Sequence, residues 1–311
     1  MSIKKIMKAY PSYRKASDKV QKRPSPFIQW VGGKRQLIER YMELFPKEFN
    51  DYYEPFLGGG SVFFHMHSIY GDKKNYFLSD LNEELVISYN EIKNNHAGVK
   101  ALYNKMYERH TKEFYYDIRN IDRHKIAERK YKFKYDICKT LNSDEIASRF
   151  IYLNKTCFNA IYRVNRSKLF NVPIGTSLKK DFSVGNLFEL CSDCLKNTPI
   201  KYNSYENIEN NTKKGDFVYL DPPYAPITAT SNFTSYTNEG FDVEDQKKLR
   251  DFCDRLDKKG VLFAVSNSSC ELIKNLYSNY EQHVFVVNRS LNSKKTKRKN
   301  SAEEILITNF T

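Results

Sequence analysis

Long hydrophobic runs are missing from this chain of 311 residues. No stretch approaches the roughly 18 consecutive apolar residues that a membrane-spanning helix requires. The basic N-terminus also lacks the apolar core and the small-residue cleavage site of a signal peptide. These absences predict an intracellular, cytoplasmic protein that does not cross a membrane.

Paired cysteines are equally scarce. Of the six cysteines, only Cys191 and Cys194 form a C-x-x-C pair. A zinc site would need a second pair or histidines at ligand spacing, and the sequence has neither nearby. We therefore expect reduced thiols here and no bound metal. Internal repeats and long low-complexity tracts are absent as well.

Acidic residues are too few to balance the basic ones. The chain has 37 Asp and Glu against 51 Lys and Arg, which gives a formal net charge of +14. The excess is dense from Lys294 to Lys299, and such an excess is typical of proteins that contact a polyanion. The alternatives are a basic surface without a partner and, for the dense run, a solvated tail.

Hydrophobic spacing divides the chain into three kinds of segment. Residues 1–26 show no clean apolar period, end in Pro24-Ser25-Pro26 and are predicted to form a basic N-terminal arm. Short apolar runs flanked by helical spacing predict an α/β domain with a doubly wound, mostly parallel sheet over residues 27–90 and 201–311. The helical spacing of apolar residues over 91–200 predicts an inserted, mainly helical module. Predicted strands begin near Tyr52 and cover Tyr76–Ser79, Phe217–Leu220, Val261–Val265 and Val284–Val287.

A glycine turn follows the first predicted strand. Gly58–Gly60 would let the backbone approach a ligand where doubly wound folds bind an adenosine-bearing cofactor. Asp80 comes twenty residues after Gly60, at the end of the next strand, where its carboxylate can accept hydrogen bonds from both ribose hydroxyls. The pattern indicates a nucleoside site. A mere tight turn and a helix-capping Asp80 are the alternatives.

Lys34, after Gly32 and Gly33, matches a phosphate-binding loop only in part. The leading glycine of that motif is missing, and Arg35 stands where a Ser or Thr would hold magnesium. The sequence therefore argues against a nucleotide triphosphatase.

The tetrapeptide Asp221-Pro222-Pro223-Tyr224 follows a predicted buried strand. Asp221 is therefore expected at the carboxyl edge of the sheet, where open α/β folds bind ligands. The prolines stiffen the turn and lack N–H groups. The Asp221 carboxylate and the Pro222 carbonyl can accept hydrogen bonds from an adenine amine, a poor nucleophile whose lone pair is delocalised, while Tyr224 stacks on the base. An ordinary turn with a capping Asp is the alternative.

In this order, the motifs resemble those of the Dam-type DNA adenine-N6 methyltransferases, the D12 class, from about Phe27 to the C-terminus. The matching segments are Phe27–Lys34, Glu54–Ser61, Ser79–Asn82, Asp221–Tyr224, Ala225–Tyr236 and Ser266–Ser268. The resemblance implies a class I methyltransferase-like fold that binds S-adenosyl-L-methionine. It assigns cofactor binding to Trp30, Lys34, Phe56, Gly58, Asp80 and Asp221, and catalysis to Asp221, Pro222 and Tyr224.

The inserted module also resembles the family, in Leu153-Asn154, Phe158–Arg163 and Phe170–Pro173. By this resemblance Phe158, Asn159 and Ile161 enter the stack beside a flipped adenine. Arg163 would read a guanine, whose two major-groove acceptors an arginine fits. Pro173 and Gln29 are the other DNA-binding residues that the resemblance implies. The alternatives are helix core for the apolar residues and a surface charge for Arg163.

The resemblance implies methyl transfer from S-adenosyl-L-methionine to N6 of adenine in duplex DNA, by base flipping and direct displacement, without a metal. GATC or a related site is expected, although Gln29 and Thr176 stand where relatives that methylate GATC often carry a lysine and an arginine. An RNA or single-stranded nucleic-acid adenine methyltransferase and a non-catalytic DNA-binding protein are the alternatives. We expect a bacterial or phage-encoded monomer, with a companion restriction endonuclease as an indirect partner.

Overall fold

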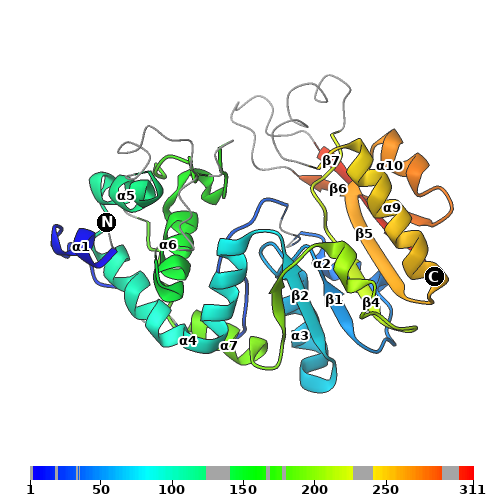
Figure 1. Cartoon of the computed structure of the whole chain (residues 1–311), viewed down its shortest axis with the longest axis horizontal. Coiled ribbons are helices and arrows are strands. Elements are labelled where there is room, and N and C mark those ends of the chain that lie inside the picture. Colours follow the sequence, from blue (N-terminus) through cyan, green and yellow to red (C-terminus); the bar gives the residue numbers. More distant parts are fainter. Residues whose placement is uncertain are drawn as a thin grey trace. The chain divides into compact units, whose positions relative to one another are not determined.

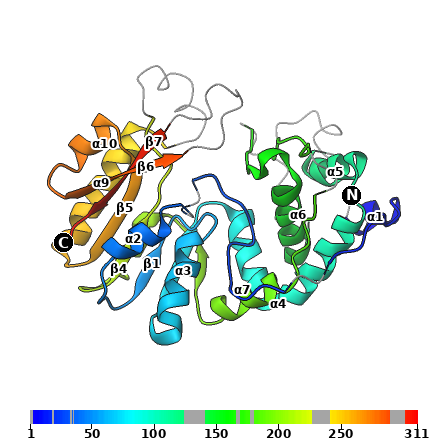
Figure 2. The same ribbon diagram turned by 180° about the vertical axis from the view of Figure 1, so that it is seen from behind.

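The computed structural model describes residues 3–17, 20–32, 34, 36–123, 141–165, 169–176, 180–226, 241–288 and 301–311. The chain forms two compact units, each described by itself. The helical unit comprises Met1–Gly33, Gly58–Ile69 and Asn82–Tyr202, and the sheet unit comprises Lys34–Leu57, Tyr70–Leu81 and Asn203–Thr311. Figures 1 and 2 show their elements from opposite sides.

Six strands of the sheet unit follow one another in the order β2-β1-β4-β5-β7-β6. They are β1 (Tyr52–Glu54), β2 (Tyr76–Asp80), β4 (Phe217–Leu220), β5 (Leu262–Ser268), β6 (Glu281–Asn288) and β7 (Ser301–Thr308). The first four in this order are parallel, with Phe217 of β4 opposite Leu262 of β5, whereas β7 is antiparallel to β5 and β6. The predicted, mostly parallel sheet is confirmed. The described helices of this unit are α2 (Ile38–Leu44), α9 (Val243–Lys258), α10 (Glu271–Leu276) and the 3-10 segments η1 (Gly71–Lys73) and η5 (Tyr205–Ile208).

Alternating side chains of β4 show how helices cover both faces of this sheet. Phe217 and Tyr219 contact Phe45, which follows α2, with ring centroids 4.9 and 5.6 Å apart. Val218 and Leu220 point to the other face and join a buried cluster with α9 and α10. Burial on both faces explains why the strand is a continuous apolar run in the sequence. The predicted doubly wound arrangement is therefore confirmed.

The helical unit is built around α4, which packs against α6 and α7. A capping box between Asn142 and Glu145 begins α6, and the predicted helical positions Ile146, Phe150 and Leu153 are buried. The described elements of this unit are α1 (Ile3–Lys8), α3 (Ser61–Tyr70, whose last residue belongs to the sheet unit), α4 (Glu83–Glu108), α5 (Lys112–Arg119), α6 (Ser143–Thr156), α7 (Leu187–Leu195), η2 (Asn120–Asp122), η4 (Phe158–Ala160) and β3 (Ile200–Tyr202).

Residues 3–8 form a helix, whereas residues 1–26 were predicted to be an arm without apolar periodicity. Ile3, Ile6 and Met7 are buried on α1, which packs against α5. A helix this short contains hardly more than one repeat of the apolar spacing, so the sequence gives little periodic signal. The compact units also group residues 58–69 and 82–90 with the helical segments, whereas the sequence analysis assigns them to the α/β domain. Among the described residues, no helix is long and apolar enough to cross a membrane.

Candidate active site and recognition segment

Asp221 follows β4 directly, at the carboxyl edge of the parallel strands. Its Oδ2 lies 2.8 Å from Lys34 Nζ, and its Oδ1 accepts a hydrogen bond of 2.7 Å from Ser266 Oγ. The Lys34 side chain is 2% exposed, whereas that of Asp221 is 24% exposed. Because a carboxylate offers about four lone-pair sites, Asp221 can accept a further hydrogen bond from a ligand.

Two buried amides hold the turn that follows Asp221. Gln246 Nε2 donates to the Pro223 carbonyl at 2.9 Å, and Asn267 Oδ1 accepts from the Ala225 N–H at 2.9 Å. The amides also join each other, because Asn267 Nδ2 donates to Gln246 Oε1 at 3.1 Å. Both side chains are 0% exposed. The backbone on each side of Tyr224 is therefore fixed by the sheet and by α9.

The Tyr224 ring is held at two points. Its hydroxyl donates to Glu304 Oε2 of β7 at 2.9 Å, and Lys34 Nζ lies 4.9 Å from the ring centroid. Burial, reinforced by the nearby Asp221 carboxylate, raises the pKa of Tyr224 well above its ordinary value. The hydroxyl therefore keeps its proton near neutral pH and remains a donor to Glu304.

Two further predicted cofactor residues of the sheet unit, Phe56 and Asp80, lie near the ends of β1 and β2. Phe56 stacks on Tyr205, with ring centroids 5.4 Å apart and an interplanar angle of 25°. Asp80 ends β2 with a partly exposed side chain. Since β1, β2 and β4 are parallel, Asp80 and Asp221 lie at the same edge of the sheet.

In the helical unit, Trp30 packs on the glycine turn. Gly58 has a left-handed φ of +48°, and a Cβ there would lie 2.7 Å from Trp30 Cδ1. A Cβ at Gly59 would lie 3.1 Å from Trp30 Cβ. Only glycine at position 58 combines this backbone conformation with this close approach of the indole. The structure thus brings together two residues that the resemblance assigns to the cofactor.

The predicted recognition residues lie on one looped segment after α6. The segment is tied by bridges between Cys157 and Ile174 and between Val164 and Phe170, and by a 2.8 Å hydrogen bond from the Phe158 N–H to the Pro173 carbonyl. Both Asn159 and Ala160 adopt left-handed φ values, 56° and 51°. Phe158, Asn159, Arg163 and Pro173 are exposed, and Ile161 is half-buried. Most of the predicted DNA-binding side chains are therefore accessible.

The two residues that depart from the GATC pattern of the resemblance lie close to this segment. Asn154 of α6 clamps the backbone of Gln29: it accepts from the Gln29 N–H at 2.9 Å and donates to the Gln29 carbonyl at 2.7 Å. The Gln29 side chain remains exposed. Thr176 is also exposed, just after the Gly175 N–H that bonds the Thr156 carbonyl.

The structure tests the simpler explanations of two acidic residues. Asn82, whose side chain accepts from the Leu85 N–H at 3.1 Å, is the N-cap of α4. Capping of this helix therefore does not explain Asp80. Residues 221–226 are not helical, so Asp221 does not cap a helix that begins at the turn itself.

Several residues that contact the candidate site were not predicted from the sequence. Glu304 and Tyr205 contact the predicted site residues Tyr224 and Phe56, and Gln246 bonds the turn at Pro223, but all three belong to elements with ordinary apolar spacing. Only Gln246 carries a signal, because it shares the apolar face of α9 with Leu249 and Cys253 and is a polar residue on that face.

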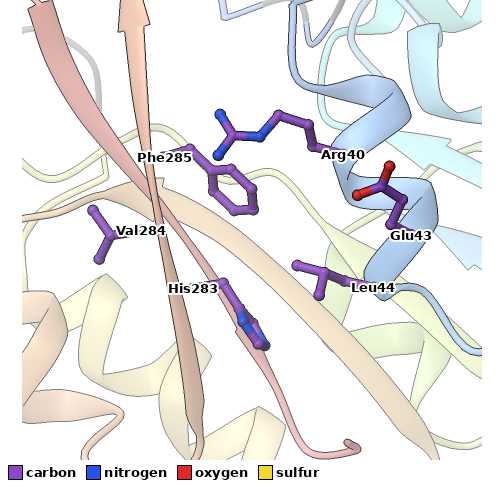
Figure 3. A pocket seen from close by; sticks show the side chains of 6 residues that line it. All are labelled: Arg40, Glu43, Leu44, His283, Val284 and Phe285. Atoms are coloured by element: carbon purple, nitrogen blue, oxygen red, sulfur yellow. The ribbon is translucent and has the colours of Figure 1, made fainter.

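A hollow of about 300 Å³ lies between α2 and β6 (Figure 3). The Arg40 guanidinium covers the Phe285 ring there, 4.4 Å from its centroid. None of the predicted site residues lines this hollow, and we assign it no ligand. Its lining consists of Arg40, Glu43, Leu44, His283, Val284 and Phe285.

The remaining sequence predictions concern metals and basic segments. Cys191 and Cys194 lie on α7 as buried thiols that form no disulfide. Over the described part of the chain, no group of three or more His, Cys, Asp or Glu residues is arranged to hold a metal ion. Gly33, Arg35, the loop 227–236 and the basic run 294–299 lie outside the described residues.

The fold and the site together define a class I methyltransferase: a doubly wound sheet with an antiparallel strand inserted beside its last strand, and an Asp-Pro-Pro-Tyr turn at the carboxyl end of β4. The chain belongs to the family of D12 class N6 adenine-specific DNA methyltransferases, whose family model matches residues 30–292. It is an adenine-specific DNA methyltransferase, and DNA is its substrate. The family and the activity predicted from the sequence are confirmed.

Curated relatives match along nearly their whole length. The Type II methyltransferase M1.LlaDCHI of Lactococcus lactis subsp. cremoris is 37% identical over 287 residues, which are 92% of this chain and 95% of the relative. The Type II methyltransferase M.MjaIII of Methanocaldococcus jannaschii is 37% identical over 302 residues, with coverages of 92% and 99%. The DNA adenine methylase of Escherichia coli K12 is 30% identical over 285 residues, with coverages of 92% and 95%.

Proposed function

We propose that the enzyme transfers a methyl group from S-adenosyl-L-methionine directly to N6 of an adenine that has left the duplex stack. The observation that carries this proposal is the state of Asp221. Its carboxylate is partly exposed at the carboxyl edge of the sheet, held by Lys34 and Ser266, and keeps acceptor capacity for an amine.

The residues present fit the proposed cofactor. In the helical unit, Trp30 on the glycine turn offers an aromatic wall and a turn free of side chains. In the sheet unit, Asp80 offers a carboxylate for ribose hydroxyls, Phe56 an aromatic face and Lys34 a buried cation. The cofactor supplies an electrophilic methyl group when bound.

The catalytic turn activates the amine by accepting its hydrogen bonds. The Asp221 carboxylate and the Pro222 carbonyl draw the nitrogen toward a tetrahedral geometry, so its lone pair becomes available. Positive charge grows on the nitrogen as the N–C bond forms and the bond from the same carbon to sulfur breaks, and preorganised acceptors stabilise that charge without reorganising. The methylated nitrogen then releases one proton to water. Tyr224, fixed by Glu304, stacks on the base and holds it in line.

The looped segment after α6 is proposed to read the DNA. Phe158, Asn159 and Ile161 fill the space that the adenine leaves, and Arg163 binds a guanine. The Arg163 Nε donates to Asn171 Oδ1 at 3.2 Å, a bond that a guanine can replace. Pro173 and the Gln29 side chain are further contacts. We propose GATC or a closely related site.

The cellular setting is proposed from the relatives. Two of them are named Type II methyltransferases, which supports a role beside a restriction endonuclease that recognises the same site. We propose that the enzyme acts as a cytoplasmic monomer of bacterial or phage origin, since a palindromic site can be methylated one strand at a time. Sedimentation with and without a duplex tests the oligomeric state.

Methyl transfer from tritiated S-adenosyl-L-methionine tests the function. We expect incorporation at adenine in duplexes that contain GATC or a one-base variant, and little in single strands or RNA. Asp221→Ala should lose at least about 3 kcal/mol of transition-state stabilisation while it keeps its fold and DNA binding. Transfer to RNA or single strands in preference to duplexes would overturn the duplex assignment. Turnover of Asp221→Ala within tenfold of wild type would remove Asp221 from the chemistry.

A further inference from the structure

Tyr162 connects the predicted cofactor wall with the residues that face DNA. Its ring stacks on Trp30, with centroids 5.5 Å apart and an interplanar angle of 17°. In the chain it stands between Ile161 and Arg163, both proposed DNA contacts. Tyr162 is therefore the one residue between these two contacts, and it lies flat on a proposed cofactor residue.

Tyr162 lies beside a buried charged cluster. Burial raises its pKa well above the ordinary value, and the Glu84 carboxylate raises it further. Glu84 is paired at 3.3 Å with Arg149, which is 1% exposed and also pairs with Asp122 at 3.1 Å. The Phe150 and Phe170 rings also pack on Tyr162, with centroids 4.8 and 5.5 Å away, so a movement of the indole is passed on within a closely packed group of rings.

Trp30 is equally constrained on its own side. The indole edge occupies the space that a Cβ at Gly58 would need, and the preceding residue, Gln29, is clamped by Asn154 of α6. The glycine turn, Trp30 and Tyr162 therefore form a continuous packed path, all within the helical unit.

We propose that Tyr162 is a positioning residue that couples cofactor binding at Trp30 to DNA reading by Ile161 and Arg163. The inference rests on the proposed cofactor role of Trp30. A ligand that resets the indole shifts the stacked ring and, through the backbone, its two neighbours. Coupling between two binding sites is reciprocal, so the correct DNA site must also act on Trp30 when no cofactor is present.

Trp30 is the only tryptophan of the chain, so its fluorescence reports on this path in the unmodified protein. S-adenosylhomocysteine alone should change the emission of the wild type. The duplex that is methylated fastest, added without cofactor, should change it too, and a scrambled duplex of equal length should change it much less. S-adenosylhomocysteine should also raise the affinity for the methylated duplex by about tenfold, a usual size for coupled sites.

Variants separate the stack from general packing. Tyr162→Phe keeps the ring on Trp30 and should retain most of the response to DNA. Tyr162→Leu should keep the response to S-adenosylhomocysteine but lose the response to DNA, with the affinity gain falling to within about twofold. Tyr103→Leu is the control for loss of a tyrosine ring in the same unit, because Tyr103 is buried and its hydroxyl bonds the Phe182 carbonyl instead.

The outcomes distinguish this inference from the proposed function. Absence of both methyl transfer and a cofactor response in the wild type would overturn the proposed function itself. An active enzyme whose Trp30 emission changes equally with both duplexes would overturn the coupling alone. So would a Tyr162→Leu variant that retains the affinity gain, or a Tyr103→Leu variant that loses it equally. If Tyr162→Leu does not fold, the coupling is still tested by the wild-type emission with the methylated and the scrambled duplex, and by the response of Tyr162→Phe.

Discussion

The hydroxyl of Tyr224 donates a hydrogen bond of 2.9 Å to Glu304, a residue of β7 that lies 80 positions later in the chain. The aromatic residue of the proposed catalytic turn is thus oriented by a strand far away in the sequence. Lys34, which covers the same ring, also pairs with Asp221. The Tyr224 ring and the proposed catalytic carboxylate of Asp221 therefore share one partner, Lys34.

Glu304→Ala should slow methyl transfer while DNA binding persists. Without its acceptor the Tyr224 ring can rotate, and loss of alignment at a reacting centre costs about ten- to a hundredfold in rate. Glu304→Gln keeps an oxygen that accepts the same hydrogen bond and should stay within a few-fold of wild type. Single-turnover kinetics on one duplex measure both variants. Equal rates for Glu304→Ala and wild type would show that Tyr224 does not depend on this contact.

Lys34→Met should abolish methyl transfer and lower the free energy of unfolding. Breaking a fully buried ion pair costs about 3 to 5 kcal/mol, and because Asp221 is partly exposed we expect a loss of about 2 kcal/mol in the free energy of unfolding. Adding Asp221→Asn to this variant should restore most of the stability, because no uncompensated carboxylate remains. Methyl transfer should not return. Urea denaturation of the two single variants and the double variant measures the coupling, and simple additivity would contradict it.

Gly58→Ala should weaken cofactor binding, and Gly71→Ala provides the control. Both glycines have left-handed φ values, +48° and +55°, so both variants lose about 1 kcal/mol or more of stability from backbone strain. Only the Cβ at position 58 meets Trp30, at 2.7 Å, whereas a Cβ at position 71 meets nothing within 4 Å. Calorimetry with S-adenosyl-L-methionine should therefore find reduced affinity for Gly58→Ala alone. Parallel losses in both variants would point to stability rather than to the indole.

Arg163→Ala should relax sequence choice without weakening general DNA binding. Loss of a bidentate contact to guanine costs about 1 to 3 kcal/mol of discrimination at one base pair. Replacing the basic residues of 294–299 by alanine should instead flatten the dependence of affinity on salt, by roughly 0.9 in log–log slope per lost phosphate contact. Affinities for specific and scrambled duplexes over a salt series separate the two effects. A uniform loss for Arg163→Ala would make it a phosphate contact.

Local patterns account for the parts of the structure that were predicted from the sequence. Phe217–Leu220 is a short apolar run, and the four residues after it are a turn with its own signature, so both could be located without knowledge of the fold. The same holds for Gly58 and for Asp80 at the end of β2. Each depends on residues within a few positions of itself.

The parts that were missed depend on contacts between distant residues. Gln246 bonds the Pro223 carbonyl 23 positions away, and Glu304 bonds Tyr224 across 80. Nothing within α9 or β7 indicates which turn these side chains will meet. β7 itself was not predicted, because its apolar core at Ile305–Ile307 is short and its two neighbours in the sheet precede it in the chain. Such strand pairing depends on contacts across the whole sheet and not on the local sequence of β7.

The place of β7 has a consequence for biosynthesis. A ribosome that has completed β6 has already made the catalytic turn, the recognition segment and most of the basic residues. β6 pairs in the described sheet with β7 alone, and Tyr224 takes its hydroxyl partner from the same strand. A nascent chain therefore lacks the partner of the Tyr224 hydroxyl until β7 has left the ribosome and entered the sheet between β5 and β6. Under the proposed mechanism, productive alignment of an adenine begins only at that point.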